Sequence, residues 1–275
     1  MIVVLHLEGV PPSVSGRDPI AVAQECAARA GRIIRQGFGR SGVVGVKGRG
    51  NVVSEVDFAV ERACAAILAR EYPSFVILGE ETASTVRSGG WMWVIDPLDG
   101  TRNFTRNIPH FCFTLALCHG GQPLLGLTLQ PLLGETFLAA TGGGAWLNGE
   151  RLHVDQAATL ANAIVAVDLG YDLGRGARTL DLARQLWPRV QAIRVPGSAA
   201  LDAAYLAAGR WDLYVHSNLQ PWDIAAAIVL VREAGAEILD RDGSPATIES
   251  EAVVAGAPSI LHEFHQVARD LPWKA

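Results

Sequence analysis

Two carboxylates, Asp96 and Asp99, follow directly on the apolar run WMWVI. A short run of β-branched and aromatic residues predicts a buried strand, and the acids at its end predict ligands at the C-terminal edge of that strand. Pro97 stiffens the turn, so both side chains can aim oxygens at one point or at two neighbouring points. Gly100 and Thr101 then offer backbone N–H groups where a helix could begin, which suits an anion. Hard oxygen ligands beside an anion site indicate Mg²⁺ and phosphate.

The same Asp-Pro-x-Asp-Gly pattern is also a good turn sequence for conformational reasons alone. Two other segments favour the chemical interpretation. Glu80 and Glu81 follow a second apolar run, FVIL, and adjacent carboxylates near Asp96 would be costly without a cation. Asp223 stands just after Pro221, where a helix is expected to begin, and an acid capping that helix is the simpler explanation of Asp223 alone. Three acidic strand or helix ends in one chain are harder to explain as turns and caps.

With these segments in view, the chain resembles the inositol monophosphatase family of Mg²⁺-dependent, Li⁺-sensitive sugar phosphatases. The resemblance runs over about residues 20–265 in the family's order and spacing. It is carried by Lys47, Asp57, Gly79-Glu80-Glu81, the stretch from Trp93 to Thr101 with Asn103-Phe104, Gly197-Ser198-Ala199-Ala200 and Trp222-Asp223.

The resemblance implies a role for each matching position. The implied metal ligands are Glu80, Asp96, the backbone carbonyl of Leu98, Asp99 and Asp223, holding two or three Mg²⁺ ions. The implied catalytic residues are Asp57 and Thr101, which would orient and deprotonate water, together with Glu81. The implied substrate-binding residues are Gly100, Thr101, Gly197, Ser198, Ala199 and His216. Independently, two Mg²⁺ ions about 3.5–4 Å apart can activate water and stabilise a leaving alkoxide, so no nucleophilic Ser or Cys is needed.

Three positions bear on the substrate. Inositol phosphatases of the family carry a Glu that contacts inositol hydroxyls seven residues before the Asp of the Trp-Asp motif, and His216 stands there. A surface residue at a strand end is the simpler explanation of His216, yet loss of the carboxylate puts inositol recognition in doubt. Arg102 replaces the small polar residue of many inositol phosphatases. Lys47, one of only two lysines, lies in a Gly-rich segment that we expect to be a loop, where it is either a solvated charge or a functional ammonium near the metals.

The expected activity is hydrolysis of a small polyol phosphate, with inositol-1-phosphate first. Histidinol phosphate is the alternative, followed by a fructose or nucleotide bisphosphate. An amine product would favour an acidic wall that His216 does not supply. Some bacterial relatives are partners of the transcription machinery, so a binding module is a further hypothesis. An inactive scaffold would be expected to lose ligands, and this chain keeps them all.

Composition agrees with an enzyme. The net charge is −5, which argues against general nucleic-acid binding. The sequence contains no run of 18 apolar residues, so we expect no membrane span. The apolar stretch at residues 2–7 is read as an extension or edge segment, not a signal peptide. The four cysteines show no metal spacing and are expected to be free, buried thiols of a cytoplasmic protein. The family is commonly dimeric, so we expect a homodimer.

The periodicities predict an α/β (α+β layered) fold of alternating helix and sheet layers. The family resemblance implies that these layers form a sandwich of the sugar-phosphatase type. We expect an extension at residues 1–17, a half with the metal motifs at 18–150 and an α/β half at 151–275, packed as one unit. Helices are expected near residues 19–37, 55–71, 174–187, 198–208, 223–234 and 258–269. Strands are expected near 75–79, 91–95, 111–119, 123–130, 135–140, 163–168, 191–195, 212–216, 236–239 and 252–255. Residues 146–150 predict a hairpin with an Asn-Gly turn.

Overall fold

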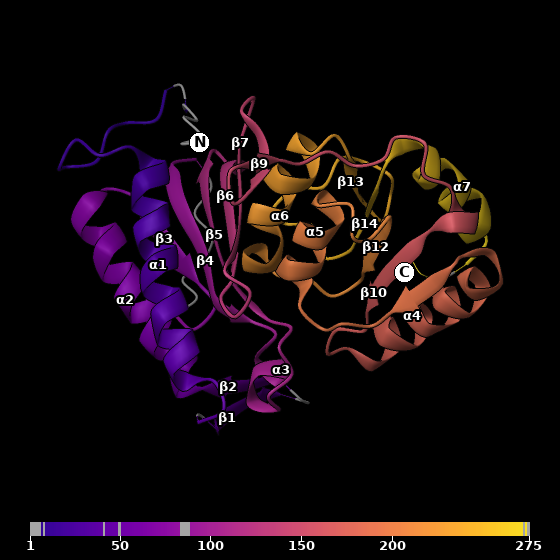
Figure 1. Cartoon of the computed structure of the whole chain (residues 1–275), viewed down its shortest axis with the longest axis horizontal. Helices are drawn as coiled ribbons and strands as arrows, with labels where there is room; N and C mark the ends of the chain where they lie inside the picture. The colour runs from indigo at the N-terminus through magenta and orange to yellow at the C-terminus, as the bar shows by residue number, and fades with distance from the viewer. Residues whose placement is uncertain are drawn as a thin grey trace.

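The computed structural model describes residues 7, 9–40, 42–48, 51–82, 89–271 and 273. These residues form five layers, in which helices and sheets alternate from one side of the molecule to the other (Figure 1). The predicted fold class, a layered α/β sandwich, is confirmed. Among the described residues, no helix is both long and apolar enough to cross a membrane.

The first layer is a pair of helices, α1 (Pro19–Gly37) and α2 (Glu55–Glu71). Helix α1 begins where the Asp18 side chain accepts the N–H of Ile20, with proline in the first turn. Its buried face repeats at helical spacing through Ile20, Ala23, Ala27, Ala30 and Ile34, as the sequence predicts. Both helices pack on one face of the first sheet (Figure 1).

The second layer is a seven-stranded sheet in the order β3-β4-β5-β6-β7-β8-β9. Its strands are β3 (Val76–Gly79), β4 (Trp91–Asp99), β5 (Cys112–His119), β6 (Gln122–Gln130), β7 (Glu135–Ala140), β8 (Gly144–Leu147) and β9 (Glu150–Arg151). Only the β3–β4 pair is parallel. The predicted Asn-Gly hairpin turn is confirmed, since Asn148 and Gly149 both have positive φ.

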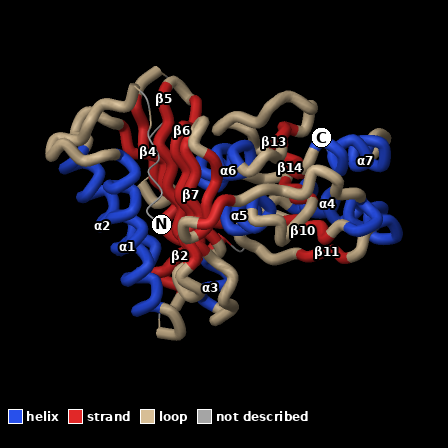
Figure 2. The backbone as a smooth tube through the Cα atoms, turned by 45° about the horizontal axis from the view of Figure 1, so that its top comes forward, coloured by secondary structure: helices blue, strands red, loops and turns tan. Residues whose placement is uncertain are grey.

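The third layer consists of α5 (Ala199–Ala207) and α6 (Pro221–Glu233), which lie between the two sheets (Figure 2). Both helices are rich in alanine, and this lets α6 approach the first sheet closely. A Cβ added to Gly126 of β6 would lie 2.5 Å from the carbonyl oxygen of Ala226, so glycine is required there. This close packing fixes the start of α6, where Asp223 lies, relative to β4.

The fourth layer is a five-stranded sheet in the order β11-β10-β12-β14-β13. Its strands are β10 (Ile164–Asp168), β11 (Ala192–Arg194), β12 (Leu213–His216), β13 (Glu237–Asp240) and β14 (Val253–Gly256). Helices α4 (Leu173–Leu186) and α7 (Pro258–Ala268) cover its outer face as the fifth layer. Short 3₁₀ turns lie at Leu160–Asn162 and Trp187–Arg189. Side chains alternate along β10 and β12 between the α5–α6 side and the α4–α7 side.

Two local expectations differ from the structure. The segment around Lys47 is a hairpin and not a loop, with β1 (Val43–Gly48) paired to β2 (Asn51–Ser54), because valines on both sides of the glycines favour extended backbone. Strand β4 runs past residue 95 to Asp99, and its register with β5 is irregular between Asp96 and Asp99, where Pro97 has no N–H to donate. A short helix α3 (Thr101–Thr105) follows the left-handed Gly100.

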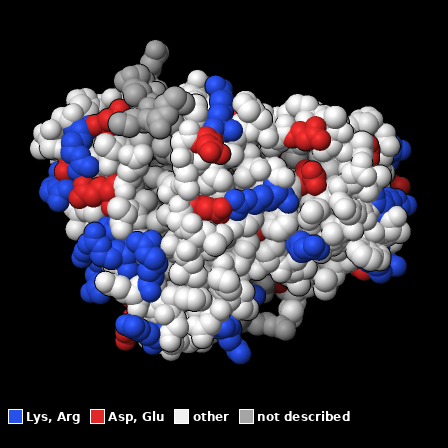
Figure 3. Space-filling view, in the orientation of Figure 1, with Lys and Arg blue, Asp and Glu red and all other residues white. Residues whose placement is uncertain are grey.

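The remaining expectations concern the surface, the termini and the cysteines. The four cysteines are free and buried, as predicted. Acidic and basic side chains are spread over the face in Figure 3 among many uncharged groups, so the acidic excess of the chain is not gathered on this face. Residues 2–6, which were expected to form an extension or edge segment, lie outside the described residues, and so does Lys274.

Candidate active site and metal centre

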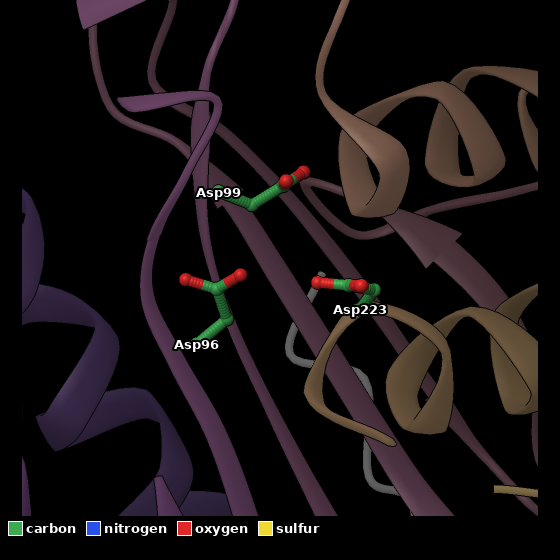
Figure 4. A group of neighbouring side chains, drawn as sticks. All are labelled: Asp96, Asp99 and Asp223. Carbon is green, nitrogen blue, oxygen red and sulfur yellow. The ribbon is translucent and has the colours of Figure 1, made fainter. Parts of the chain in front are cut away.

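Three carboxylates from two distant parts of the chain converge. Asp96 and Asp99 lie at the C-terminal end of β4, and Asp223 lies in the first turn of α6. One oxygen from each lies within 4.8 Å of the others. Figure 4 shows Asp223 facing the two acids of β4 across a common space. The structure thus brings three of the expected metal ligands together, and Glu80 is not within this group.

Each carboxylate is held by a hydrogen bond to one of its two oxygens. Asp96 Oδ1 accepts the N–H of Leu98 at 2.9 Å. Asp223 Oδ2 accepts the N–H of Gln220 at 2.7 Å, within a capping box. The capping role that the sequence suggested for Asp223 is therefore real, and it leaves the second oxygen for a ligand.

Asp99 is held by the start of α5. Its Oδ2 accepts the Ser198 hydroxyl at 2.6 Å and the backbone N–H of Ala200 at 2.8 Å. Ser198, which was expected to bind substrate, is buried and does not line the cavity described below. The structure instead makes Ser198 a residue that positions Asp99.

The electrostatics of the cluster favour a cation. Burial raises the pKa of Asp96 well above its ordinary value, and the nearby charges of Glu80 and Asp99 raise it further. Burial and Asp99 also raise the pKa of Asp223. One buried and two partly buried carboxylates at this distance repel one another unless a positive charge lies between them. An all-oxygen donor set of this kind fits Mg²⁺.

The Asp57–Thr101 pair forms as predicted. Thr101 Oγ1 lies 3.0 Å from Asp57 Oδ1 and 2.9 Å from the carbonyl oxygen of Leu98, and can donate its proton to either. The other oxygen of Asp57 accepts the Ser54 N–H and hydroxyl in the capping box of α2. Burial raises the pKa of Asp57 despite these bonds. One oxygen of Asp57 thus belongs to the capping box of α2, and the other is within hydrogen-bond distance of Thr101.

Lys47 lies against the two glutamates that follow β3. Its Nζ is 3.2 Å from Glu80 Oε1 and 2.6 Å from Glu81 Oε1. Burial lowers the pKa of Lys47, but the bonds to Glu81 and Glu80 outweigh it and the net shift is upward. Burial raises the pKa of Glu80 to about 7, although Lys47 opposes the rise. Glu80 lines the same cavity as the three aspartates, whereas Glu81 does not.

A cavity of about 530 Å³ opens over the carboxylates. Its lining includes most of the residues singled out from sequence: Lys47, Glu80, Asp96, Leu98, Asp99, Gly100, Thr101, Arg102, Gly197, Ala199, His216 and Asp223. Asp168 and Tyr171 are among the lining residues that the sequence analysis missed. Asp168 ends the apolar run IVAV just as Asp96 ends WMWVI, so the same signal could have found it.

His216 is buried at the end of β12, so it is not the surface residue that the sequence left open. Its Nδ1 accepts the N–H of Asn218 at 3.0 Å. Burial lowers the pKa of His216 to about 4, against the raising effect of Asp99. The ring is therefore neutral at pH 7, and its proton resides on Nε2.

Arg102 and Tyr171 meet at the edge of the cavity. The Arg102 guanidinium carbon lies 4.1 Å above the centre of the Tyr171 ring, which is a cation–π contact. Arg102 comes from α3, and Tyr171 from the loop between β10 and α4. The contact therefore joins the two sheet-bearing parts of the chain beside the site.

Asp96→Asn should stabilise the protein when no metal is bound. Because the pKa of Asp96 is raised in the folded state, folding loses stability as pH rises from the ordinary carboxyl range through that raised value. We expect the variant in EDTA to melt a few degrees above the wild type at pH 8, about 2–4 °C for each kcal/mol gained. The gain should shrink towards pH 4, and added Mg²⁺ should raise the Tm of the wild type more than that of the variant.

The matched control is Asp240→Asn. Asp240 also ends a strand, β13, and does not line the cavity. Its Tm should respond to Mg²⁺ as the wild type does. A variant Asp96→Asn that melts below the wild type in EDTA at pH 8 would show that the cluster carries no repulsion.

A layered sandwich with converging carboxylates at a strand end and a helix start indicates a metal-dependent enzyme, and comparison with known proteins names the family. Residues 17–271 match the Inositol monophosphatase family. The chain is 37% identical over 243 residues to Nus factor SuhB of Pseudomonas aeruginosa, covering 86% of this chain and 90% of that protein. It is 35% identical over 259 residues to an inositol-1-monophosphatase of Rhizobium meliloti, covering 92% and 97%.

Among solved structures, extragenic suppressor protein suhB from Bartonella henselae aligns with a TM-score of 0.86 at 32% identity. The alignment covers 91% of this chain and 98% of that one. The chain therefore belongs to the inositol monophosphatase family, and it is a phosphoric monoester hydrolase of that family.

Proposed function

We propose that this protein is an Mg²⁺-dependent hydrolase of small polyol phosphates, with inositol-1-phosphate as its substrate. The observation that carries the proposal is the cluster of Asp96, Asp99 and Asp223 at the cavity. The name of the Rhizobium meliloti relative supports the choice of substrate.

The residues suited to holding two or three Mg²⁺ ions are the three aspartates, Glu80 and the carbonyl oxygen of Leu98. Bound ions would lower the pKa of a water molecule and stabilise charge on the phosphate and on the leaving alkoxide. Glu80 is bonded to Lys47 and is not within the group of three, so its part in metal binding requires a change of partner.

The protein's own contribution to the chemistry lies on the Asp57–Thr101 side. A water that donates to Thr101 Oγ1 can pass its proton through the hydroxyl to Asp57 Oδ1, 3.0 Å away. The raised pKa of Asp57 makes this carboxylate a better base. We assign the backbone N–H groups of Gly100 and Thr101 to phosphate binding. Glu81 would act indirectly, by holding Lys47 through the hydrogen bond between them.

The alcohol would lie on the opposite wall. Gly197, Ala199 and His216 line that side, and the small residues leave room for a ring. Asn103 holds this wall in place, because its Nδ2 donates to the carbonyl oxygens of Pro196 and Gly197. A neutral His216 donates where a carboxylate could only accept.

Release of phosphate by purified protein tests the proposal. The panel is inositol-1-phosphate, histidinol phosphate, fructose-1,6-bisphosphate and adenosine 3′,5′-bisphosphate, each with Mg²⁺ and with EDTA. We expect Mg²⁺-dependent turnover with the highest kcat/KM for inositol-1-phosphate. A higher kcat/KM for either alternative class would reassign the substrate, and turnover that persists in EDTA would contradict the metal mechanism.

A binding role is the second hypothesis, because one relative bears the name Nus factor SuhB. The intact carboxylate set favours catalysis, since binding to a protein partner does not require it.

We also propose that the protein is a cytoplasmic homodimer that is inhibited by Li⁺ and binds neither nucleic acid nor membrane. Its chain would divide near residue 150 into two halves, which follow an N-terminal extension of residues 1–17.

A further inference from the structure

Asp168 stands on the inner face of the second sheet. Along β10, Val165 and Val167 pack on the α4–α7 side, whereas Ala166 packs on the α5–α6 side. Because side chains alternate along a strand, Asp168 shares the inner face with Ala166. It lines the cavity at the point where β10 ends.

His216 lies beside Asp168 on the same face. Strands β10 and β12 are parallel neighbours, and Asp168 is in register with His216. Tyr214, two residues earlier, packs on the α5–α6 side, so His216 points inward too. Neighbouring strands are about 4.8 Å apart, which places the two side chains next to each other at the cavity.

The two side chains have complementary hydrogen-bonding chemistry. Asp168 Oδ1 accepts the N–H of Leu169 at 3.0 Å, and no described residue donates to Oδ2. His216 uses Nδ1 to accept the N–H of Asn218, which leaves Nε2–H as a donor. An acceptor and a donor side by side suit two neighbouring hydroxyl groups, since each hydroxyl can both donate and accept.

The charges on this wall distinguish between kinds of leaving group. Burial raises the pKa of Asp168 to about 6 and the charge of Asp99 adds to the rise, whereas the Arg102 cation opposes it. The wall thus carries one cation and one carboxylate. A second phosphate would be repelled by Asp168 and Asp99 but attracted by Arg102, and an ammonium group would be attracted by the two carboxylates but repelled by Arg102. A neutral alcohol with several hydroxyls can hydrogen-bond to Asp168 without repulsion from either charge.

We propose that Asp168 is a specificity-determining residue, which together with His216 binds two neighbouring hydroxyls of a neutral polyol leaving group. This inference rests on the proposed phosphatase function and deepens it. It also accounts for recognition of a polyol by a chain that has histidine at position 216.

The test compares two esters that share a ring, inositol-1-phosphate and cyclohexyl phosphate, which has no hydroxyl groups. Wild type, Asp168→Asn and Asp168→Ala are assayed with saturating Mg²⁺, and Asp240→Asn is the matched strand-end control, because Asp240 Oδ1 also accepts the N–H of the next residue. We expect the wild type to prefer inositol-1-phosphate. In Asp168→Ala, the ratio of the two kcat/KM values should fall about 10- to 100-fold, the range for loss of a hydrogen bond to a charged group. The fall should be smaller in Asp168→Asn, which keeps an acceptor oxygen.

A second pair of variants tests the donor. His216→Phe should lower the same ratio of kcat/KM values, and His216→Gln, which keeps an N–H, should recover part of it.

If the wild type prefers inositol-1-phosphate but Asp168→Ala changes kcat/KM equally for both esters, the inference fails while the proposed function stands. If the wild type hydrolyses both esters without preference, the inference and the polyol assignment fail but the phosphatase stands. If it hydrolyses neither, the proposed function fails, and the inference with it.

Discussion

Asp99→Asn should reduce kcat/KM by on the order of 10³-fold or more, the equivalent of several kcal/mol of transition-state stabilisation. Asp99 is the central acid of the site, because its charge acts on Asp96, Asp223 and His216. An amide at this position has no charge to offer a cation. It must also place either its oxygen or its NH₂ group against the two donors from Ser198 and Ala200.

The fold should survive this change, because the substitution preserves shape and relieves repulsion in the cluster. Circular dichroism and Tm in EDTA check the fold, and phosphate release from inositol-1-phosphate gives the activity. Ser198→Ala is an informative companion, since it removes one bond to Asp99 and should cost about 10–100-fold, as outer-shell partners of metal sites do. An Asp99→Asn protein within tenfold of wild-type activity would remove Asp99 from the metal centre.

Thr101→Ala should lower kcat by about 10²–10⁴-fold, the range for loss of a positioned general base. The hydroxyl connects the site to Asp57 at 3.0 Å, and alanine breaks that connection without touching the three-aspartate cluster. Mg²⁺ binding, measured by calorimetry, should therefore change little while turnover collapses. Thr101→Ser keeps the hydroxyl and is the matched control.

A loss of kcat in Thr101→Ala accompanied by an equal loss of Mg²⁺ affinity would point to metal binding. In that case the proton-transfer role of the Asp57–Thr101 pair would be wrong. Near-wild-type kcat would exclude the pair from the chemistry altogether.

The sequence predicts those parts of the site that depend on local signals. Apolar runs that end in acids predicted the strands that precede Asp96 and Glu80. Pro221 marked the start of α6, with Asp223 in its first turn. For Asp223, capping and chemical roles appeared as alternatives. The structure shows that one oxygen can cap while the other serves the site, so the two interpretations are compatible.

What the sequence could not predict depends on contacts between distant residues. The Ser198–Asp99 bond joins residues 99 apart, and it turns an expected substrate contact into a support for a carboxylate. The burial of His216 follows from the packing of α5 and α6 over the second sheet, which no local pattern reveals. Asp168 carried the right local signal, but only the register of β10 with β12 places it beside His216.

The most direct measurement for the whole account is an anomalous difference map from crystals soaked in Mn²⁺, an ion that takes the same oxygen ligands as Mg²⁺. The account requires peaks between Asp96, Asp99 and Asp223, with carboxylate oxygens about 2–2.5 Å from the ions. Active protein that shows no peak at this cluster, or peaks only elsewhere in the molecule, would contradict it.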